Sequence, residues 1–122
     1  MNDRLSLYPR LNSALRPIIE TVNDRYVLSD GTRTVDLYPI QGLAHSASML
    51  IAYLPKEKIV VEADLYNPPA PNAPAPTTAS ASNLTFYQNI QRLKLDISQI
   101  ASIHGRMVPM SEFLKVVGKS SN

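Results

Sequence analysis

The feature that most limits what this chain can form is a proline-rich stretch just past its middle. Five of the ten prolines lie between Pro68 and Pro76, within the segment YNPPAPNAPAPTTASAS. Proline lacks the amide hydrogen that helices and sheets use, and its ring fixes the backbone, so no regular element survives this density. We therefore expect an extended surface loop over residues 67–83, which separates one group of elements from another.

Before this loop, the spacing of apolar residues predicts β-strands. RYVL and TRTVDLYPI flank the turn signal Ser29-Asp30-Gly31, and residues 32–39 alternate between a more polar and a less polar face. SMLIAYL and IVVEADL follow, joined by the charged turn PKEK. Within them, MLIAYL and IVVEA are apolar on both faces, as in buried strands. Together these segments predict an antiparallel strand meander.

After the loop, the period changes to that of a helix. Asn83 is in position to cap a helix from about Leu84, with an apolar stripe at Phe86, Ile90 and Leu93. A short strand, IASI, and a final helix between Pro109 and Gly118 complete the order. Strands, a long loop, a helix, a strand and a helix are typical of an α+β or a layered α/β domain.

Length, charge and cysteine content narrow the class of protein. The 122 residues fit one domain, 1–122, in which residues 1–24 form an irregular N-terminal segment. The net charge is +2 and no block of like charge appears, so we expect neither a nucleic-acid nor a membrane partner. The absence of cysteine fits a reducing compartment, and no segment resembles a signal peptide or a membrane span. We expect a soluble, cytoplasmic protein.

Three residues are candidates for metal binding: His45, Asp64 and His104. Each stands at the end of a predicted apolar run, where side chains leave the core, and both histidines have small neighbours that leave room for a ligand. Imidazole nitrogens and carboxylate oxygens bind zinc, iron and manganese. Taken singly, a histidine or an aspartate in a small domain more often has a structural role, and the spacing across loops is not a compact motif.

The order of these residues gives the chain a specific resemblance. From about Tyr26 to Gly118 it resembles the C-terminal half of the metallo-β-lactamase-fold hydrolases, through GLAHSASMLIAYLPKEKIVVEADLYNPP, NIQRLKLD and SIHGRMVPMSEFLKVVG. In that family a histidine follows a strand, as His45 does. An aspartate ends the next strand in an ADL-like motif, as Asp64 does, and a His-Gly pair closes the site, as at His104.

The resemblance implies a fold, a site and a chemistry. The fold would be α+β, half of the αβ/βα metallo-β-lactamase sandwich, with a strand meander and two helices. His45 would complete one metal site, Asp64 would bridge two metals, and His104 would complete the second. The cofactor would be zinc, with iron or manganese as alternatives, and the pair of ions would lower the pKa of a shared water near neutral pH.

One motif of the family is absent. The H-x-H-x-D-H signature belongs to the N-terminal half, and this chain has only two histidines. A second copy of the chain brings the same ligands again, from the same strand ends, so a homodimer is not expected to replace the signature. A half-fold would also leave an apolar face and an open strand edge. We therefore expect either a homo-oligomer, most simply a dimer, or a complementary N-terminal half.

Three functions remain open on the sequence. The chain is a metal-dependent hydrolase of a small-molecule substrate that needs a partner half, a metal-binding or interaction module without turnover, or a truncated product that folds without a catalytic role. No residue of the chain is assigned as a catalytic acid, base or nucleophile, because no serine has an accompanying base and orienting group.

Overall fold

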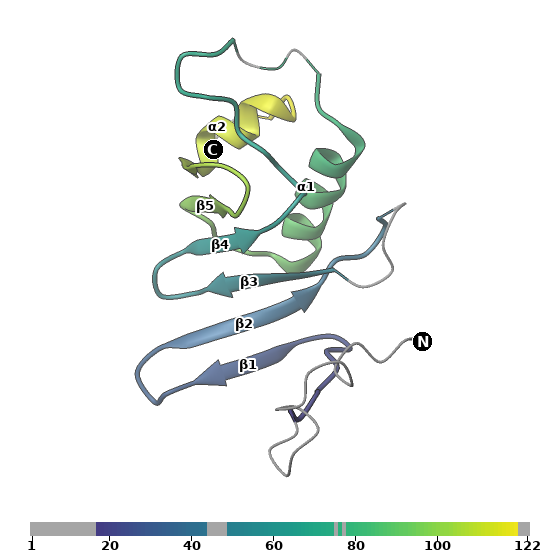
Figure 1. The fold of residues 1–122 in the computed structure, drawn as a ribbon, viewed down its shortest axis with the longest axis vertical. Coiled ribbons are helices and arrows are strands. Elements are labelled where there is room, and N and C mark those ends of the chain that lie inside the picture. Colours follow the sequence, from purple (N-terminus) through teal and green to yellow (C-terminus); the bar gives the residue numbers. More distant parts are fainter. Residues whose placement is uncertain (1–16, 44–48, 75, 77, 120–122) are drawn as a thin grey trace, which may run out of the picture.

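A computed structural model describes residues 17–43, 49–74, 76 and 78–119. Within these residues the chain forms one six-stranded sheet and two helices (Figure 1). The elements in order are β1 (Tyr26–Ser29), β2 (Thr34–Pro39), β3 (Leu50–Leu54), β4 (Ile59–Glu62), α1 (Ala81–Leu93), β5 (Gln99–Ser102), β6 (Met107–Pro109) and α2 (Met110–Val116). Residues 17–24 of the expected irregular segment form neither helix nor strand.

The strand order in space equals the order in sequence, from β1 to β6. Neighbouring strands are antiparallel except for β4 and β5, which are parallel. They are parallel because the loop and α1 carry the chain from the end of β4 back to the edge of the sheet where β4 begins. The expected α+β arrangement of a strand meander plus two helices is confirmed. The parallel pair within it is an addition that the sequence pattern did not predict.

One face of the sheet is buried under the helices. A cross-strand row of Asp36, Tyr53, Val60, Ile100 and Val108 is buried in every strand from β2 to β6. Phe86 and Ile90 of α1 and Phe113 of α2 belong to the same core cluster as Val60, Ile100 and Val108. Figure 1 shows both helices beside the β3–β5 part of the sheet, with the β1–β2 hairpin extending away from them.

The opposite face of the sheet carries no helix from the described residues and is apolar. The adjacent cross-strand row contains Tyr26, Leu37, Ala52, Val61, Ala101 and Met107. None of these side chains is charged and none is fully buried, and Met107 is 47% exposed. The runs that looked buried on both faces are therefore covered on one face only by the part of the chain that the structure describes.

The start of α1 differs from the sequence prediction. The helix begins at Ala81 with Ser80 as its N-cap, three residues before the predicted cap at Asn83. Asn83 takes part in the cap in another way, because its side chain accepts from the Ser80 amide while Ser80 accepts from the Asn83 amide. The proline-rich loop consequently ends at Ser80 rather than at Asn83.

The sequence pattern predicted α2 well but did not predict strand β6. Three residues ending in a proline are too few for a recognisable strand pattern, and β6 owes its existence to pairing with β5. Pro109 serves as N-cap of α2 and Phe113 is its buried anchor. Among the described residues, no helix has the length and apolar character that a membrane span requires.

Candidate metal centre

The parallel pair β4–β5 brings two of the three candidate ligands together. Glu62 and Ser102 are register partners at the carboxyl ends of these strands, and Asp64 and His104 each follow two residues later. The carboxyl ends of neighbouring parallel strands meet at one edge of a sheet, which is where side chains of such loops converge. The two residues therefore meet because of the strand direction that α1 imposes.

Asp64 and His104 are in direct contact. The distance between Asp64 Oδ1 and His104 Nε2 is 3.1 Å, and their side chains are 65% and 57% exposed. Two ligand atoms bound to one tetrahedral ion at about 2.0–2.1 Å lie about 3.3 Å apart. The carboxylate oxygen and the imidazole nitrogen thus have the chemistry and the separation of two ligands of one ion, and solvent reaches both.

The turn that carries Asp64 is stabilised by hydrogen bonds to the Glu62 carboxylate. Asp64 has a φ of 66°, in the left-handed region that aspartate tolerates better than most residues. The amides of Leu65 and Tyr66 donate to Glu62 Oε2 at 2.9 and 3.2 Å, which closes the turn around Asp64. Burial raises the pKa of Glu62 above its ordinary value, while the hydrogen bonds from Ser102 and from the two amides oppose that rise.

His45, the third candidate, lies outside the described residues. The residues on either side of its segment are anchored, because the Ile40 amide donates to the Met49 carbonyl at 2.8 Å. Asn89 of α1 is bonded to both backbone groups of Gln41, at 3.0 and 2.9 Å. The register of β2, β3 and β4 puts this connection at the same sheet edge as the end of β4. In the described part of the chain, no group of three or more potential metal ligands occurs.

The His-Gly turn packs against the start of the proline-rich loop. A Cβ atom on Gly105 would lie 2.8 Å from Pro68 Cδ, so only glycine permits this approach. Arg106 donates to the Pro69 carbonyl at 2.9 Å and is paired with Glu112 of α2. The loop is consequently fixed at its base, directly beside the turn that presents His104.

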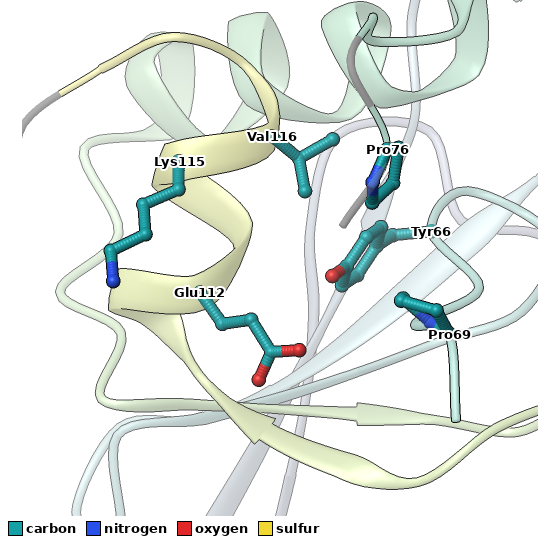
Figure 2. A pocket seen from close by; sticks show the side chains of 6 residues that line it. All are labelled: Tyr66, Pro69, Pro76, Glu112, Lys115 and Val116. Carbon is teal, nitrogen blue, oxygen red and sulfur yellow. The ribbon is translucent and has the colours of Figure 1, made fainter. Parts of the chain in front are cut away.

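Two hollows adjoin this region. One, of about 410 Å³, is bordered by Asp64 and by polar side chains of the loop and of the α1 start, among them Asn67, Ser80 and Ser82. The other, of about 90 Å³, is shown in Figure 2, where the Tyr66 hydroxyl lies between the prolines and the α2 side chains. That hydroxyl is buried and has no hydrogen-bond partner among the described residues. The first hollow has the size of a small-molecule site.

Sequence analysis missed the polar residues that support the candidate ligands. Glu62 was counted within an apolar run, and Ser102 was placed in a short strand without a role. A signal existed, since Glu62 and Val60 are two residues apart and therefore face the same side of a strand. A carboxylate on the core side of a strand needs buried partners, and this marks it as part of a hydrogen-bonded site.

Solved structures that share this fold include a metallo-β-lactamase and a flavodiiron protein. A metallo-β-lactamase from Pontibacter korlensis has a TM-score of 0.55 at 18% identity, over 89% of this chain and 50% of that one. A flavodiiron protein from Giardia intestinalis has a TM-score of 0.54 at 19% identity, over 78% of this chain and 28% of that one. This chain spans half or less of the length of either protein. No family model and no curated protein matches the sequence.

The likeness confirms the expected fold. The chain has the metallo-β-lactamase fold in part, and the coverage agrees with the expected C-terminal half of the sandwich. At these identities the likeness establishes architecture and not chemistry.

Proposed function

We propose that this chain is the metal-binding C-terminal half of a metal-dependent hydrolase, and that turnover requires a second half. Asp64, His104 and His45 would hold the metal, with zinc as the first choice and iron or manganese as alternatives. The observation that carries the proposal is the 3.1 Å contact between Asp64 Oδ1 and His104 Nε2 at the ends of two parallel strands. The connection that carries His45 leaves and re-enters the sheet at this edge.

The chemistry of the donors supports a hydrolytic role. A bound ion of this kind polarises a substrate oxygen and makes water acidic enough to ionise near neutral pH. Asp64 would supply the charge and His104 a neutral nitrogen. The hollow beside Asp64, lined by hydroxyl and amide groups, would take a small-molecule substrate and orient it by hydrogen bonds.

The open face of the sheet supports the need for a second half. The row from Tyr26 to Met107 crosses all six strands without a charge. Two sheets that pack face to face bury such rows against each other at about 10 Å. We propose that a complementary half covers this face and contributes the ligands that the chain lacks. The absence of cysteine is consistent with our proposal of the cytoplasm as its compartment.

Zinc binding tests the first part of the proposal. Purified protein should bind zinc in stoichiometric amount, and Asp64→Asn and His104→Ala should each weaken that binding strongly. Asp96→Asn is a matched control, because Asp96 is also an exposed aspartate in a surface pair, with Lys58, at the opposite edge of the sheet. Equal zinc binding by all four proteins, or by none, would refute the assignment of the ligands.

A second candidate function is favoured by the same open face. The chain would then be an oligomeric interaction module that binds metal without turnover, and a second copy would cover the apolar row. Sedimentation at high concentration separates this candidate from the hydrolase half, since the interaction module should be a dimer. Val61→Lys, on the open face of the sheet, should dissociate that dimer, and the control Gln88→Lys, on the exposed surface of α1, should not. A dimer with zinc and no hydrolysis of a chromogenic β-lactam or ester would select this candidate.

A further inference from the structure

Glu62 is the least accessible charged residue near the candidate ligands. Its side chain is fully enclosed, at 2% exposure, although it lies only two residues before the solvent-exposed Asp64. A carboxyl group in such a place is unfavourable unless each oxygen has a hydrogen-bond partner. Both oxygens of Glu62 have partners, and these partners belong to two different segments of the chain.

The first oxygen closes the Asp64 turn. Oε2 accepts from the amides of Leu65 and Tyr66, which are the two residues directly after Asp64. A left-handed conformation at a residue other than glycine persists only when its surroundings hold it. The two amide bonds supply that constraint, because they fix the chain immediately beyond Asp64 to the strand immediately before it.

The second oxygen ties this turn to the strand that leads to His104. Ser102 Oγ lies 2.6 Å from Glu62 Oε1 and 3.0 Å from the Tyr66 carbonyl oxygen. The amide of Ile103 donates to the Glu62 carbonyl at 3.0 Å and prolongs the parallel pairing by one residue. One carboxyl group therefore connects the end of β4, the Asp64 turn and the end of β5.

We infer that Glu62 is a positioning residue that sets the separation of Asp64 and His104. It touches neither the candidate ion nor the substrate hollow, and it acts through the two turns that it joins. This role rests on the proposed metal site. Residues that orient metal ligands typically change metal affinity by about 10- to 100-fold when they are lost.

Two substitutions separate geometry from charge. Glu62→Gln keeps an oxygen for the two amides and an amide group that donates to Ser102, whose hydroxyl then donates to the Tyr66 carbonyl. Glu62→Leu puts an apolar side chain in the same place and removes every bond that the Glu62 side chain makes. Zinc affinity should stay close to that of the unsubstituted protein in the Gln variant, and it should fall by about 10- to 100-fold in the Leu variant.

A control distinguishes positioning from general loss of stability. Asp36 is another buried carboxyl on a strand of the same sheet face, bonded to Arg25 and distant from β5 in the strand order. Asp36→Leu should lower stability in urea without a change in zinc affinity. If Glu62→Leu does not fold, Ser102→Ala removes only the side-chain link from β5 to Glu62 and to the Tyr66 carbonyl, and it should still weaken zinc binding.

A metal-free measurement keeps the inference separate from the proposed function. The coupling between the amide and α protons of Asp64 reports its φ angle and should be unchanged in Glu62→Gln and altered in Glu62→Leu. Preserved coupling and preserved zinc affinity in a folded Glu62→Leu protein would overturn the inference. Failure of the unsubstituted protein to bind zinc would refute the metal site alone, and the coupling would still decide whether Glu62 holds the turn.

Discussion

Replacement of Gly105 by alanine tests how the His104 turn is held against the proline-rich loop. The new Cβ would lie 2.8 Å from Pro68 Cδ, a separation that real Cβ atoms essentially never show, and 3.1 Å from Pro68 Cγ. Gly105 does not have a φ in the left-handed region, so backbone strain plays no part in this substitution. The contact involves a rigid ring rather than the flexible end of a side chain, so the turn or the loop must move.

The expected change in the free energy of unfolding follows from two opposing effects. Forcing an extra carbon into a packed contact costs about 1–3 kcal/mol, whereas alanine restricts the unfolded chain and returns about 0.4–1 kcal/mol. We expect Gly105→Ala to lower the free energy of unfolding by about 1–2 kcal/mol. Equilibrium unfolding in urea measures this difference directly.

A double-mutant cycle with Pro68→Ala isolates the contact. Without the proline ring, the nearest atom to the new Cβ is the backbone nitrogen of residue 68 at 3.7 Å, an ordinary separation. In that background Gly105→Ala should be neutral or stabilising by up to about 1 kcal/mol. An equal loss in both backgrounds would refute the reasoning, because the cost would then come from the turn itself and not from Pro68.

Three further predictions concern stability. Ser80→Ala removes the N-cap of α1 and should lower the free energy of unfolding by about 1 kcal/mol in urea, with Ser80→Gly closer to the unsubstituted protein. Phe113→Ala should lower the free energy of unfolding by about 3–5 kcal/mol, because this ring is fully buried and packs against two others. Its centroid lies 4.9 Å from that of Tyr66 and 5.2 Å from that of Phe86. The amides of Arg33 and Thr32 lower the pKa of Asp30 from 3.8 to about 2. A lowered pKa gives stability that is present above pH 3.8 and is lost as the pH falls toward 2, so acid titrations of unfolding should be shallower in Asp30→Ala over that range.

Local patterns predicted every element of this fold except β6. Alternation and the Ser29-Asp30-Gly31 signal located the β1–β2 hairpin, and the apolar stripe located α1 with Phe86 and Ile90 buried. These predictions succeed because burial of one face imposes a period of two on strands and 3.6 on helices. The start of α1 was wrong by three residues because serine and asparagine both suit a cap, and only the hydrogen bonds distinguish Ser80 from Asn83.

The candidate ligands also divide into what the sequence predicted and what only the structure shows. Asp64 and His104 were predicted from their positions at the ends of apolar runs and from the family resemblance, and the structure brings them into contact. Nothing in the sequence states that β4 and β5 run parallel, yet this direction is what puts both turns at one sheet edge. The role of Glu62 was equally hidden, since its amide partners Leu65 and Tyr66 are local but its partner Ser102 is 40 residues away and is brought to it by strand pairing.

Apart from β6, which forms by pairing with β5, the sequence by itself determined which segments are strands, helices and loop, because each of these depends on residues within a few positions of one another. It also determined which donors the chain has for a metal, since it contains only two histidines and no cysteine. The tertiary structure alone decided the parallel direction of β4 and β5, the pairing of the buried Glu62 with Ser102 and the open apolar face. These depend on contacts between distant segments, whose energies are set by packing in three dimensions and leave no periodic trace along the chain.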